Sequence, residues 1–364
     1  MAIPLVDVKA QLGPVLDELQ RRVAAVVASG RFVLGPEVEA FEQEAAAYLG
    51  ARHAIGVANG TDALVLVLDA LGIGRGDEVI CPAFTFFATA EAVARLGATP
   101  VFADIDPRTL NLDPEDVARR AGGRTKAIVA VHLFGRPLSL ERLPAGIPVI
   151  EDTAQAFGAV LGDRRAGAQG LAGTFSFFPT KNLPGIGDGG LVATGDGELA
   201  ERLRLLRFHG SRDKQTFELV GYNSRLDEVQ AAALRLLLGR LDGWNASRRE
   251  AAARYASLGL GEVCRLPDDE PGHVYHMYVV RSQQRDRIAA ALRAAGIGCA
   301  SYYATPLHLQ PVFAGLGYAP GSLPVTEQAA AENLALPLWA GIEQETQRRV
   351  VECVRQAVRG KAAA

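Results

Sequence analysis

Residues 53–72, HAIGVANGTDALVLVLDALG, contain the change of pattern that decides the fold. The first part, 53–59, is short and apolar, as in a buried strand. The second part, 60–72, opens with Gly-Thr-Asp and continues as an apolar helix. The chain therefore turns from strand to helix at Asn59-Gly60-Thr61. A strand followed at once by a helix is the repeating unit of parallel α/β sheets.

The same alternation extends outward from this unit to about residue 210. Further strands are predicted at 77–84, 99–106, 125–135, the start of 147–159, 173–180 and 189–196, and further helices at 14–29, 35–51 and 85–97. We therefore predict an α/β fold whose large domain has a mainly parallel sheet with helices on both faces.

The alternation ends at a long helix predicted over 224–258, which we expect to be kinked or split near Gly243. The elements predicted beyond it are a strand at 274–281, a helix at 286–297 and a last helix from about 343. These indicate a smaller α+β domain. We predict a large cofactor-binding domain at 1–245, including the N-terminal helices, and a small C-terminal domain at 246–364.

The composition is that of an ordinary globular protein. Hydrophobic residues make up 49% of the 364 residues, and the formal net charge is −3. This charge indicates neither a nucleic-acid nor a membrane partner, and no segment approaches the roughly 20 apolar residues of a membrane span. The N-terminus does not have the pattern of a signal peptide. The four cysteines show no CxxC spacing, so we expect reduced thiols in a cytoplasmic protein, with no metal site.

A single lysine stands out in residues 174–190, TFSFFPTKNLPGIGDGG. Only 5 of the 38 Lys and Arg residues are Lys, and a buried Lys, unlike Arg, can lose its proton and act as an amine nucleophile. The following GIGDGG matches a dinucleotide-binding pattern, but a strand-like LVAT follows it instead of a helix. We interpret these glycines as a flexible turn, or as backbone that passes close to a flat ligand beside Lys181.

Two other segments carry groups that could bind a cofactor. In VIEDTAQAFG (149–158), Glu151 and Asp152 fall at a probable strand end, where a carboxylate could pair with a protonated ring nitrogen. Asp152 could instead cap a helix. In NGTDAL (59–64), the start of the helix could bind a phosphate, although ordinary capping by Asn59 or Thr61 gives the same pattern. A Lys, an acid and a phosphate site are together what pyridoxal phosphate requires.

Collinear segments along nearly the whole chain resemble the DegT/StrS-type sugar aminotransferases, which are fold-type-I pyridoxal-phosphate enzymes. The segments that carry the resemblance are GRFVLGPEVEAFE, NGTDAL, GDEVICPAFTFFATA, PVFADIDPRTLNLDP, VIEDTAQAFGA, SFFPTKNL, GDGG, GYNSRLDEVQAA, PLHLQPVF and LALPLW. A branch of this family has His in place of the Lys and does not transaminate, whereas this chain has Lys181.

The resemblance implies a role for each matching residue. Lys181 matches the lysine that bonds the cofactor and later moves the proton. Asp152 matches the acid at the pyridine nitrogen, Gln155 the residue near the ring hydroxyl, and Phe86 the aromatic that stacks on the ring. The positions that match the phosphate site are Gly60, Thr61, Asp62 and Ser176. Asn223 matches an Asn that reaches the phosphate of the neighbouring subunit, which implies a homodimer with shared active sites.

The subgroup motifs AQAFG, PTKNL with GDGG, and NSRLDE resemble members that aminate 3-keto nucleotide sugars. The implied reaction transfers an amino group from L-glutamate to a UDP-linked 3-keto-N-acetylglucosaminuronate or a dTDP-3-keto-6-deoxyhexose. A 4-keto sugar or a keto-cyclitol as acceptor, and a non-catalytic sensor or binding module, remain alternatives. His308 and Arg225 are candidate substrate contacts. Alternatively, His308 could be a packing residue and Arg225 a solvated charge on the surface.

Overall fold

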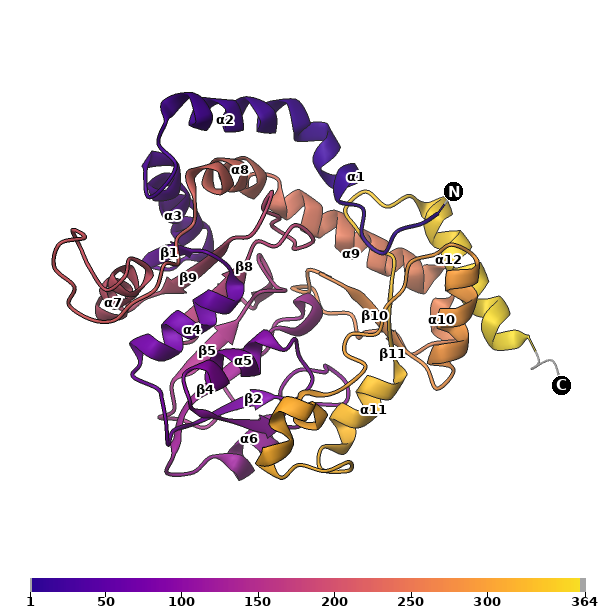
Figure 1. Ribbon diagram of the computed structural model, residues 1–364. Helices are drawn as coiled ribbons and strands as arrows, with labels where there is room; N and C mark the ends of the chain where they lie inside the picture. Colours follow the sequence, from indigo (N-terminus) through magenta and orange to yellow (C-terminus); the bar gives the residue numbers. More distant parts are fainter. Residues whose placement is uncertain (1, 361–364) are drawn as a thin grey trace.

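The computed structural model describes residues 2–360 and is built around one seven-stranded sheet (Figure 1). The strand order is β1-β9-β8-β5-β4-β2-β3. Within the described residues, β9 alone runs antiparallel to its neighbours, so the sheet is mainly parallel, as predicted. The strands of this sheet are β1 (His53–Val57), β2 (Glu78–Pro82), β3 (Thr99–Ala103), β4 (Thr125–Val131), β5 (Val149–Asp152), β8 (Ala172–Ser176) and β9 (Gly190–Thr194). Two shorter strands, β6 (Val160–Leu161) and β7 (Arg164–Arg165), form a separate hairpin.

Helices cover both faces of this sheet. The helices up to residue 257 are α1 (Val8–Leu12), α2 (Leu16–Ser29), α3 (Pro36–Leu49), α4 (Gly60–Ala70), α5 (Ala88–Arg95), α6 (Pro114–Arg120), α7 (Gly197–Arg207), α8 (Glu228–Leu238) and α9 (Leu241–Ser257). Short 3-10 helices lie at η1 (Gly13–Val15) and η2 (Leu133–Gly135). The predicted alternation of strand and helix over 53–210 is confirmed, because each predicted strand and helix there has a counterpart in the structure.

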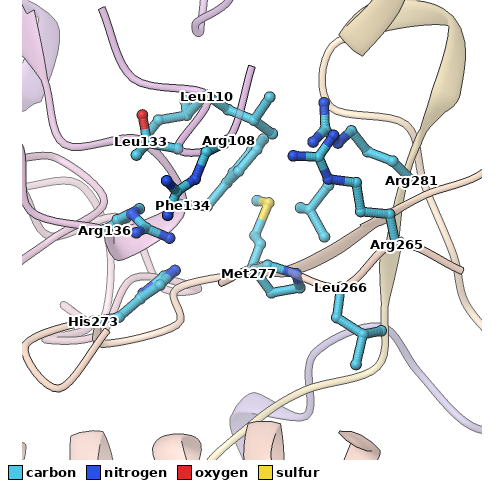
Figure 2. Close-up of a pocket in the computed structure, with 13 residues that line it drawn as sticks. Arg108, Leu110, Leu133, Phe134, Arg136, Arg265, Leu266, His273, Met277 and Arg281 are labelled. Atoms are coloured by element: carbon cyan, nitrogen blue, oxygen red, sulfur yellow. The ribbon is translucent and has the colours of Figure 1, made fainter. Parts of the chain in front are cut away.

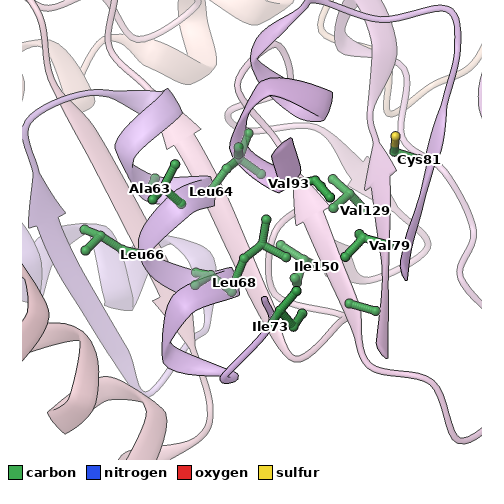
Figure 3. Close-up of a cluster of buried hydrophobic side chains, with 14 of the residues drawn as sticks. Ala63, Leu64, Leu66, Leu68, Ile73, Val79, Cys81, Val93, Val129 and Ile150 are labelled. Atoms are coloured by element: carbon green, nitrogen blue, oxygen red, sulfur yellow. The ribbon is translucent and has the colours of Figure 1, made fainter. Parts of the chain in front are cut away.

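Side chains that alternate along each strand divide the core into two layers. On β1, Ile55 packs in the cluster that α4, α5 and α7 form with one face of the sheet, and Figure 3 shows part of that cluster. The neighbouring Ala54 points the other way, into the cluster that contains α2, α3 and α8. The sheet is therefore buried on both faces, as expected for parallel strands flanked by helices.

The long helix predicted over 224–258 is two helices, but the prediction of a break near Gly243 is wrong. The helices separate at Gly239 and Arg240, between α8 and α9. Gly243 lies inside α9 and has no atom within 4 Å of the position a β-carbon would take. Nothing there forces a break, and the helix continues through it at the modest cost of one glycine.

The C-terminal residues form a smaller α+β unit. Its regular elements are η3 (Leu260–Glu262), β10 (Tyr278–Arg281), α10 (Arg285–Ala294), η4 (Leu307–Leu309), η5 (Pro311–Leu316), α11 (Pro324–Glu332), β11 (Asn333–Leu336) and α12 (Gln344–Arg359). Strands β10 and β11 pair antiparallel, and α9, α10 and α12 pack with them (Figure 1). Helix α9 runs across the boundary predicted at 245/246, and the division into two domains remains a proposal.

A buried glutamate from α8 holds the start of α3. Glu228 accepts hydrogen bonds from the backbone N–H groups of Gly35 (2.8 Å), Glu37 (2.9 Å) and Val38 (3.0 Å). The first N–H groups of a helix have no partner within the helix, so a carboxylate at that position satisfies them and complements the helix dipole. Glu228 thus supplies the cap that α3 lacks from its own Gly35.

Replacing Glu228 with Gln is expected to lower the free energy of unfolding by about 2–3 kcal/mol, because an amide group would face N–H donors that the carboxylate now satisfies. Urea unfolding followed by circular dichroism measures this loss. The matched control is Glu250→Gln, since Glu250 lies exposed on α9. Equal stability of the two variants would show that Glu228 does not cap α3.

In the described part of the chain, no helix is both long and apolar enough to cross a membrane. Residues 2–360 also contain no cluster of three or more His, Cys, Asp or Glu side chains that could hold a metal ion.

Candidate active site

The carboxyl ends of the parallel strands bring several predicted site residues to one edge of the sheet. Asp152 ends β5 and Ser176 ends β8, and these two strands are parallel neighbours. Lys181 follows β8 in a turn whose backbone is held by a hydrogen bond from its N–H to the carbonyl of Phe178 (2.8 Å). Open α/β sheets bind their ligands at this edge.

Asp152 is a buried carboxylate with two hydrogen-bond donors. The Thr89 hydroxyl donates to Oδ2 (2.9 Å) and the Ala154 N–H donates to Oδ1 (3.2 Å). Burial raises the pKa of Asp152, and these two hydrogen bonds and the charge of Lys181 oppose that rise. The next regular element after β5 is the strand β6 and not a helix, so the alternative that Asp152 caps a helix is wrong. Thr89 was not singled out from the sequence, although a lone Thr at the start of an apolar helix could have suggested it.

Lys181 carries the amine that the sequence predicted to be unusual. Burial lowers its pKa from the ordinary 10.5 to about 8, and the charge of Asp152 opposes this change. The next residue, Asn182, donates from Nδ2 to Asn245 Oδ1 (2.7 Å) on α9 and to the Val274 carbonyl (2.9 Å). These bonds anchor the lysine turn to the C-terminal half of the chain, and a proton can leave or return to Nζ near neutral pH.

The start of α4 meets the end of β8 in close contact. A β-carbon on Gly60 would lie 2.7 Å from the Ser176 Cβ, so only glycine lets these segments approach. Asn59 caps the helix by accepting from the Asp62 N–H (2.8 Å), which confirms one of the capping alternatives. The other first-turn N–H groups of α4, at Gly60 and Thr61, have no partner within the helix. Beside the Ser176 hydroxyl they form a place for an anion.

Tyr303 contacts both Gln155 and Phe86, and it lies close enough to Asp152 to feel its charge. Gln155 accepts from the Phe134 N–H at Oε1 (2.7 Å) and donates from Nε2 to the Tyr303 hydroxyl (2.9 Å). The Phe86 side chain is 57% exposed, and its ring centroid is 6.3 Å from that of Tyr303. Tyr303 could not be identified from the sequence, because it lies in the C-terminal half of the chain, 148 residues from Gln155.

Glu151, next to Asp152, has a structural role, because its side chain accepts hydrogen bonds that hold a loop. His132 accepts the Leu138 N–H at Nδ1 (2.9 Å), so its Nε2 carries the proton and donates to Glu151 (2.8 Å). The remaining donors to Glu151 are the backbone N–H groups of Gly167, Gln169 and Gly170. With its hydrogen bonds used in this way, Glu151 orders a loop and Asp152 is left as the carboxylate that faces the site.

Asn223 and Arg225 lie together beside the start of α4. Arg225 donates to Asn223 Oδ1 and sits over the Phe208 ring, 5.6 Å from its centroid. Between them, Ser224 accepts the Ala58 N–H at its hydroxyl (3.1 Å), which places this loop against the end of β1. The predicted reach of Asn223 into a neighbouring subunit and the predicted substrate contact of Arg225 remain predictions.

The structure places His308 in η4, 1% exposed. Its Nε2 is paired with Glu327 Oε1 (3.1 Å), and its ring packs at a steep angle against Tyr318. These contacts favour the packing alternative given by the sequence, and a substrate contact by His308 remains a prediction.

The glycines after Lys181 lead into β9, a strand, so the chain has no dinucleotide-binding helix at this point. The Ile186 N–H donates to Gln230 Oε1 (2.9 Å), and a β-carbon on Gly187 would lie 2.7 Å from Gln230 Nε2. These glycines thus pack closely against Gln230 on α8, and their predicted approach to a flat ligand beside Lys181 remains a prediction.

These groups fit pyridoxal phosphate. A lysine amine of lowered pKa and a buried carboxylate lie close enough to influence each other's charge, as a covalent anchor and a partner for the pyridine nitrogen require. The tight contact between Gly60 and Ser176 leaves backbone N–H groups and a hydroxyl at a helix start, which suits the phosphate. A mainly parallel sheet with this set at one edge defines the class of pyridoxal-phosphate-dependent aminotransferases of fold type I.

The chain belongs to the DegT/DnrJ/EryC1/StrS aminotransferase family, because the sequence model of that family matches residues 15–355. It is therefore an aminotransferase, and its cofactor is pyridoxal phosphate.

Three characterised relatives are similar along essentially their whole length. The chain is 46% identical to a protein of Geobacillus stearothermophilus named "pleiotropic regulatory protein" (99% of each chain). It is 44% identical to the dTDP-3-amino-3,4,6-trideoxy-α-D-glucose transaminase of Streptomyces venezuelae (97% of this chain, 96% of the relative). It is 43% identical to the UDP-N-acetyl-3-dehydro-α-D-glucosamine 3-aminotransferase of Acidithiobacillus ferrooxidans (99% of each).

Two solved structures are similar in fold to this chain. The crystal structure of DesV from S. venezuelae superposes with a TM-score of 0.95 at 44% identity, covering 98% of this chain and 99% of that one. NtdA from Bacillus subtilis, solved with the bound cofactor PMP, superposes with a TM-score of 0.87 at 31% identity, covering 94% and 82%.

Proposed function

We propose that this protein transfers the amino group of L-glutamate to a nucleotide-linked 3-keto sugar and so produces a 3-amino sugar. The observation that carries the proposal is the Lys181 amine, whose pKa burial lowers to about 8, next to the buried carboxylate of Asp152. The acceptor class is supported by the relatives from S. venezuelae and A. ferrooxidans, whose names specify amination at the 3-position of dTDP- and UDP-linked sugars. The candidate acceptors are UDP-3-keto-N-acetylglucosaminuronate and a dTDP-3-keto-6-deoxyhexose.

In this proposal Lys181 would bond the cofactor, Asp152 would pair with its ring nitrogen, Phe86 would stack on the ring and Gln155 would lie near the ring hydroxyl. The phosphate would be held by Gly60, Thr61, Asp62 and Ser176. When bound, pyridoxal phosphate supplies an electron-accepting ring that carries the amino group from donor to acceptor. The negative charge of Asp152 favours the protonated ring nitrogen and so strengthens this electron withdrawal.

Lys181 also serves as the acid and base. With a pKa of about 8, a fraction of the amine is unprotonated at neutral pH and most of it is protonated, so the same Nζ can remove a proton and return it. Asn182, bonded to Asn245 and to the Val274 carbonyl, keeps the lysine turn in place during these transfers. A reaction in two halves, with one substrate leaving before the other binds, gives ping-pong kinetics.

We further propose a cytoplasmic homodimer with shared active sites. Near the predicted site residues, Phe86, Phe178 and Ile186 expose large apolar side chains, which supports an interface at this edge. Asn223, exposed and held in place by Arg225, would reach the neighbouring phosphate site. All four cysteines are free thiols in the structure, in keeping with a reducing compartment.

The test is turnover of holoenzyme with L-glutamate and each of the two 3-keto sugar nucleotides, with a dTDP-4-keto-6-deoxyhexose as the matched comparison. The proposal expects 2-oxoglutarate to form, with NMR locating the new nitrogen at the 3-position. Nitrogen found only at the 4-position would establish the 4-keto alternative. Conversion of glutamate without any sugar product would direct the search to keto-cyclitols.

A non-catalytic role is the remaining alternative, and the regulatory name of the G. stearothermophilus relative is the observation behind it. The intact set of Lys181, Asp152 and Ser176 argues against it, since a binding module has no need of a lysine with a lowered pKa. Turnover of any keto sugar would eliminate this alternative.

A further inference from the structure

A pocket rich in arginine lies between η2 and β10 and is lined in part by Phe134, whose N–H donates to Gln155. Its cavity volume is about 30 Å³. Figure 2 shows Arg108 and Arg136 on one side of this pocket and Arg265 and Arg281 on the other. The first two come from the part of the chain that carries the large sheet, and the other two from the C-terminal part. No Asp or Glu is among the lining residues that the structure describes.

Two of these arginines are held opposite each other by the backbone. The Arg265 N–H donates to the Arg281 carbonyl (2.9 Å) and the Arg281 N–H donates to the Arg265 carbonyl (2.9 Å), in an antiparallel bridge. Residues directly opposite in such a pair share a face, and like charges placed there destabilise the fold. Arg281 is also only 8% exposed. Burial and the charge of Arg265 lower its pKa, and the charges of Glu332, Asp268 and Asp106 oppose this change.

Carboxylates form direct ion pairs with the arginines on only one side of the pocket. Arg108 pairs with Asp268 (3.2 Å), and Arg136 donates to the Asp268 carbonyl (3.1 Å) and to Glu270 (3.5 Å). On the other side, Arg281 donates to the Pro107 carbonyl (2.6 Å). Across residues 2–360, no carboxylate lies within 4.0 Å of the guanidinium groups of Arg265 or Arg281. Within the part of the chain that the structure describes, the guanidinium groups of Arg265 and Arg281 therefore lack a carboxylate in direct contact.

We propose that this pocket is a second anion site, which binds a phosphate group between the two halves of the chain. A phosphate or phosphomonoester carries a charge of about −1.5 to −2 at pH 7, which matches the two unpaired arginines. The planar guanidinium group can also bind phosphate oxygens in pairs. The active-site elements used above do not include any of the four arginines.

A ligand here would act on both halves of the chain. Its oxygens would contact Arg265 and Arg281 on the C-terminal side, next to Phe134, whose N–H holds Gln155 of the active site. The phosphate group could belong to a free phosphorylated metabolite or to the diphosphate of a nucleotide-linked substrate. The chemistry of recognition is the same for both.

Isothermal titration of the holoenzyme with inorganic phosphate, at ionic strength held constant with sodium chloride, tests the proposal. Bound cofactor fills its own phosphate site, so the titration reports the arginine pocket. We expect one saturable site per chain, and Arg265→Gln should weaken binding at least about tenfold. Arg265 is exposed, so this variant should fold, and Arg281→Gln should weaken binding in the same way.

The matched control is Arg52→Gln, an exposed arginine next to the edge strand β1 that does not line the pocket. It should bind phosphate as the wild type does. Equal binding by Arg265→Gln and Arg52→Gln, or no saturable binding at all, would overturn the proposal. Competition then identifies the source of the group: displacement of phosphate by UDP assigns the pocket to a nucleotide diphosphate, and displacement by glycerol phosphate alone assigns it to a free phosphorylated metabolite.

Discussion

Replacing Lys181 with Ala is expected to reduce kcat/KM for amino transfer by roughly 10⁴-fold or more, the largest effect of any single substitution in this chain. Alanine removes both the amine that anchors the cofactor and the group that moves the proton. The fold should survive, because the lysine turn is held by its backbone bond to Phe178 and by Asn182. The rate of 2-oxoglutarate formation from L-glutamate and a keto sugar measures the loss. The matched control is Lys126→Ala, since Lys126 is exposed at the start of β4.

The lowered pKa of Lys181 gives this prediction a second readout. An amine attacks only when it is unprotonated. Capture of pyridoxal phosphate by the cofactor-free enzyme should therefore accelerate as the pH rises through about 8, then level off. The visible absorption of the protein follows this reaction. A midpoint near the ordinary 10.5 would mean that burial does not perturb the amine, and more than about 1% residual turnover in Lys181→Ala would assign the proton transfer to another group.

Local pattern was sufficient to predict the sheet and to place Asp152 and Ser176 together at one of its edges. The strands that end at Asp152 and Ser176 are short apolar runs, which the sequence shows directly. Parallel sheets bind ligands at the carboxyl ends of their strands, and this rule predicts the edge at which a ligand would bind. The break between α8 and α9 was placed wrongly, at Gly243, because a glycine is a weak signal inside a helix that packing holds together.

Contacts between distant segments could not be predicted from pattern. Tyr303 bonds Gln155, and Glu228 caps α3 from more than 190 residues away, yet neither residue is distinguished by its sequence neighbours. The tertiary fold also decided between interpretations that the sequence left open: Glu151 is committed to backbone N–H groups, and no helix follows Asp152 for it to cap.

Asp152→Asn is the second substitution with a large expected effect, a fall in kcat of about 100-fold or more. Asparagine keeps the shape of the side chain: its Oδ1 can still accept the Ala154 N–H, and its amide NH2 can donate to the Thr89 hydroxyl oxygen, so the packing of this buried group should persist. What it loses is the negative charge that favours a protonated ring nitrogen. Steady-state kinetics should show the loss mainly in kcat, because the interaction strengthens electron withdrawal during the reaction more than it binds substrate. Asp163→Asn, at an exposed position, is the matched control.

The same substitution should also move the titration of Lys181. The charge of Asp152 raises the pKa of Lys181 against the effect of burial. Removing this charge leaves burial unopposed, so the pH midpoint of cofactor capture should fall below its wild-type value near 8. A midpoint that stays the same would mean that the two groups are not electrostatically coupled, even if kcat falls. A lower midpoint together with a lower kcat would show that one carboxylate both sets the charge of the ring nitrogen and keeps the catalytic lysine protonated near neutral pH.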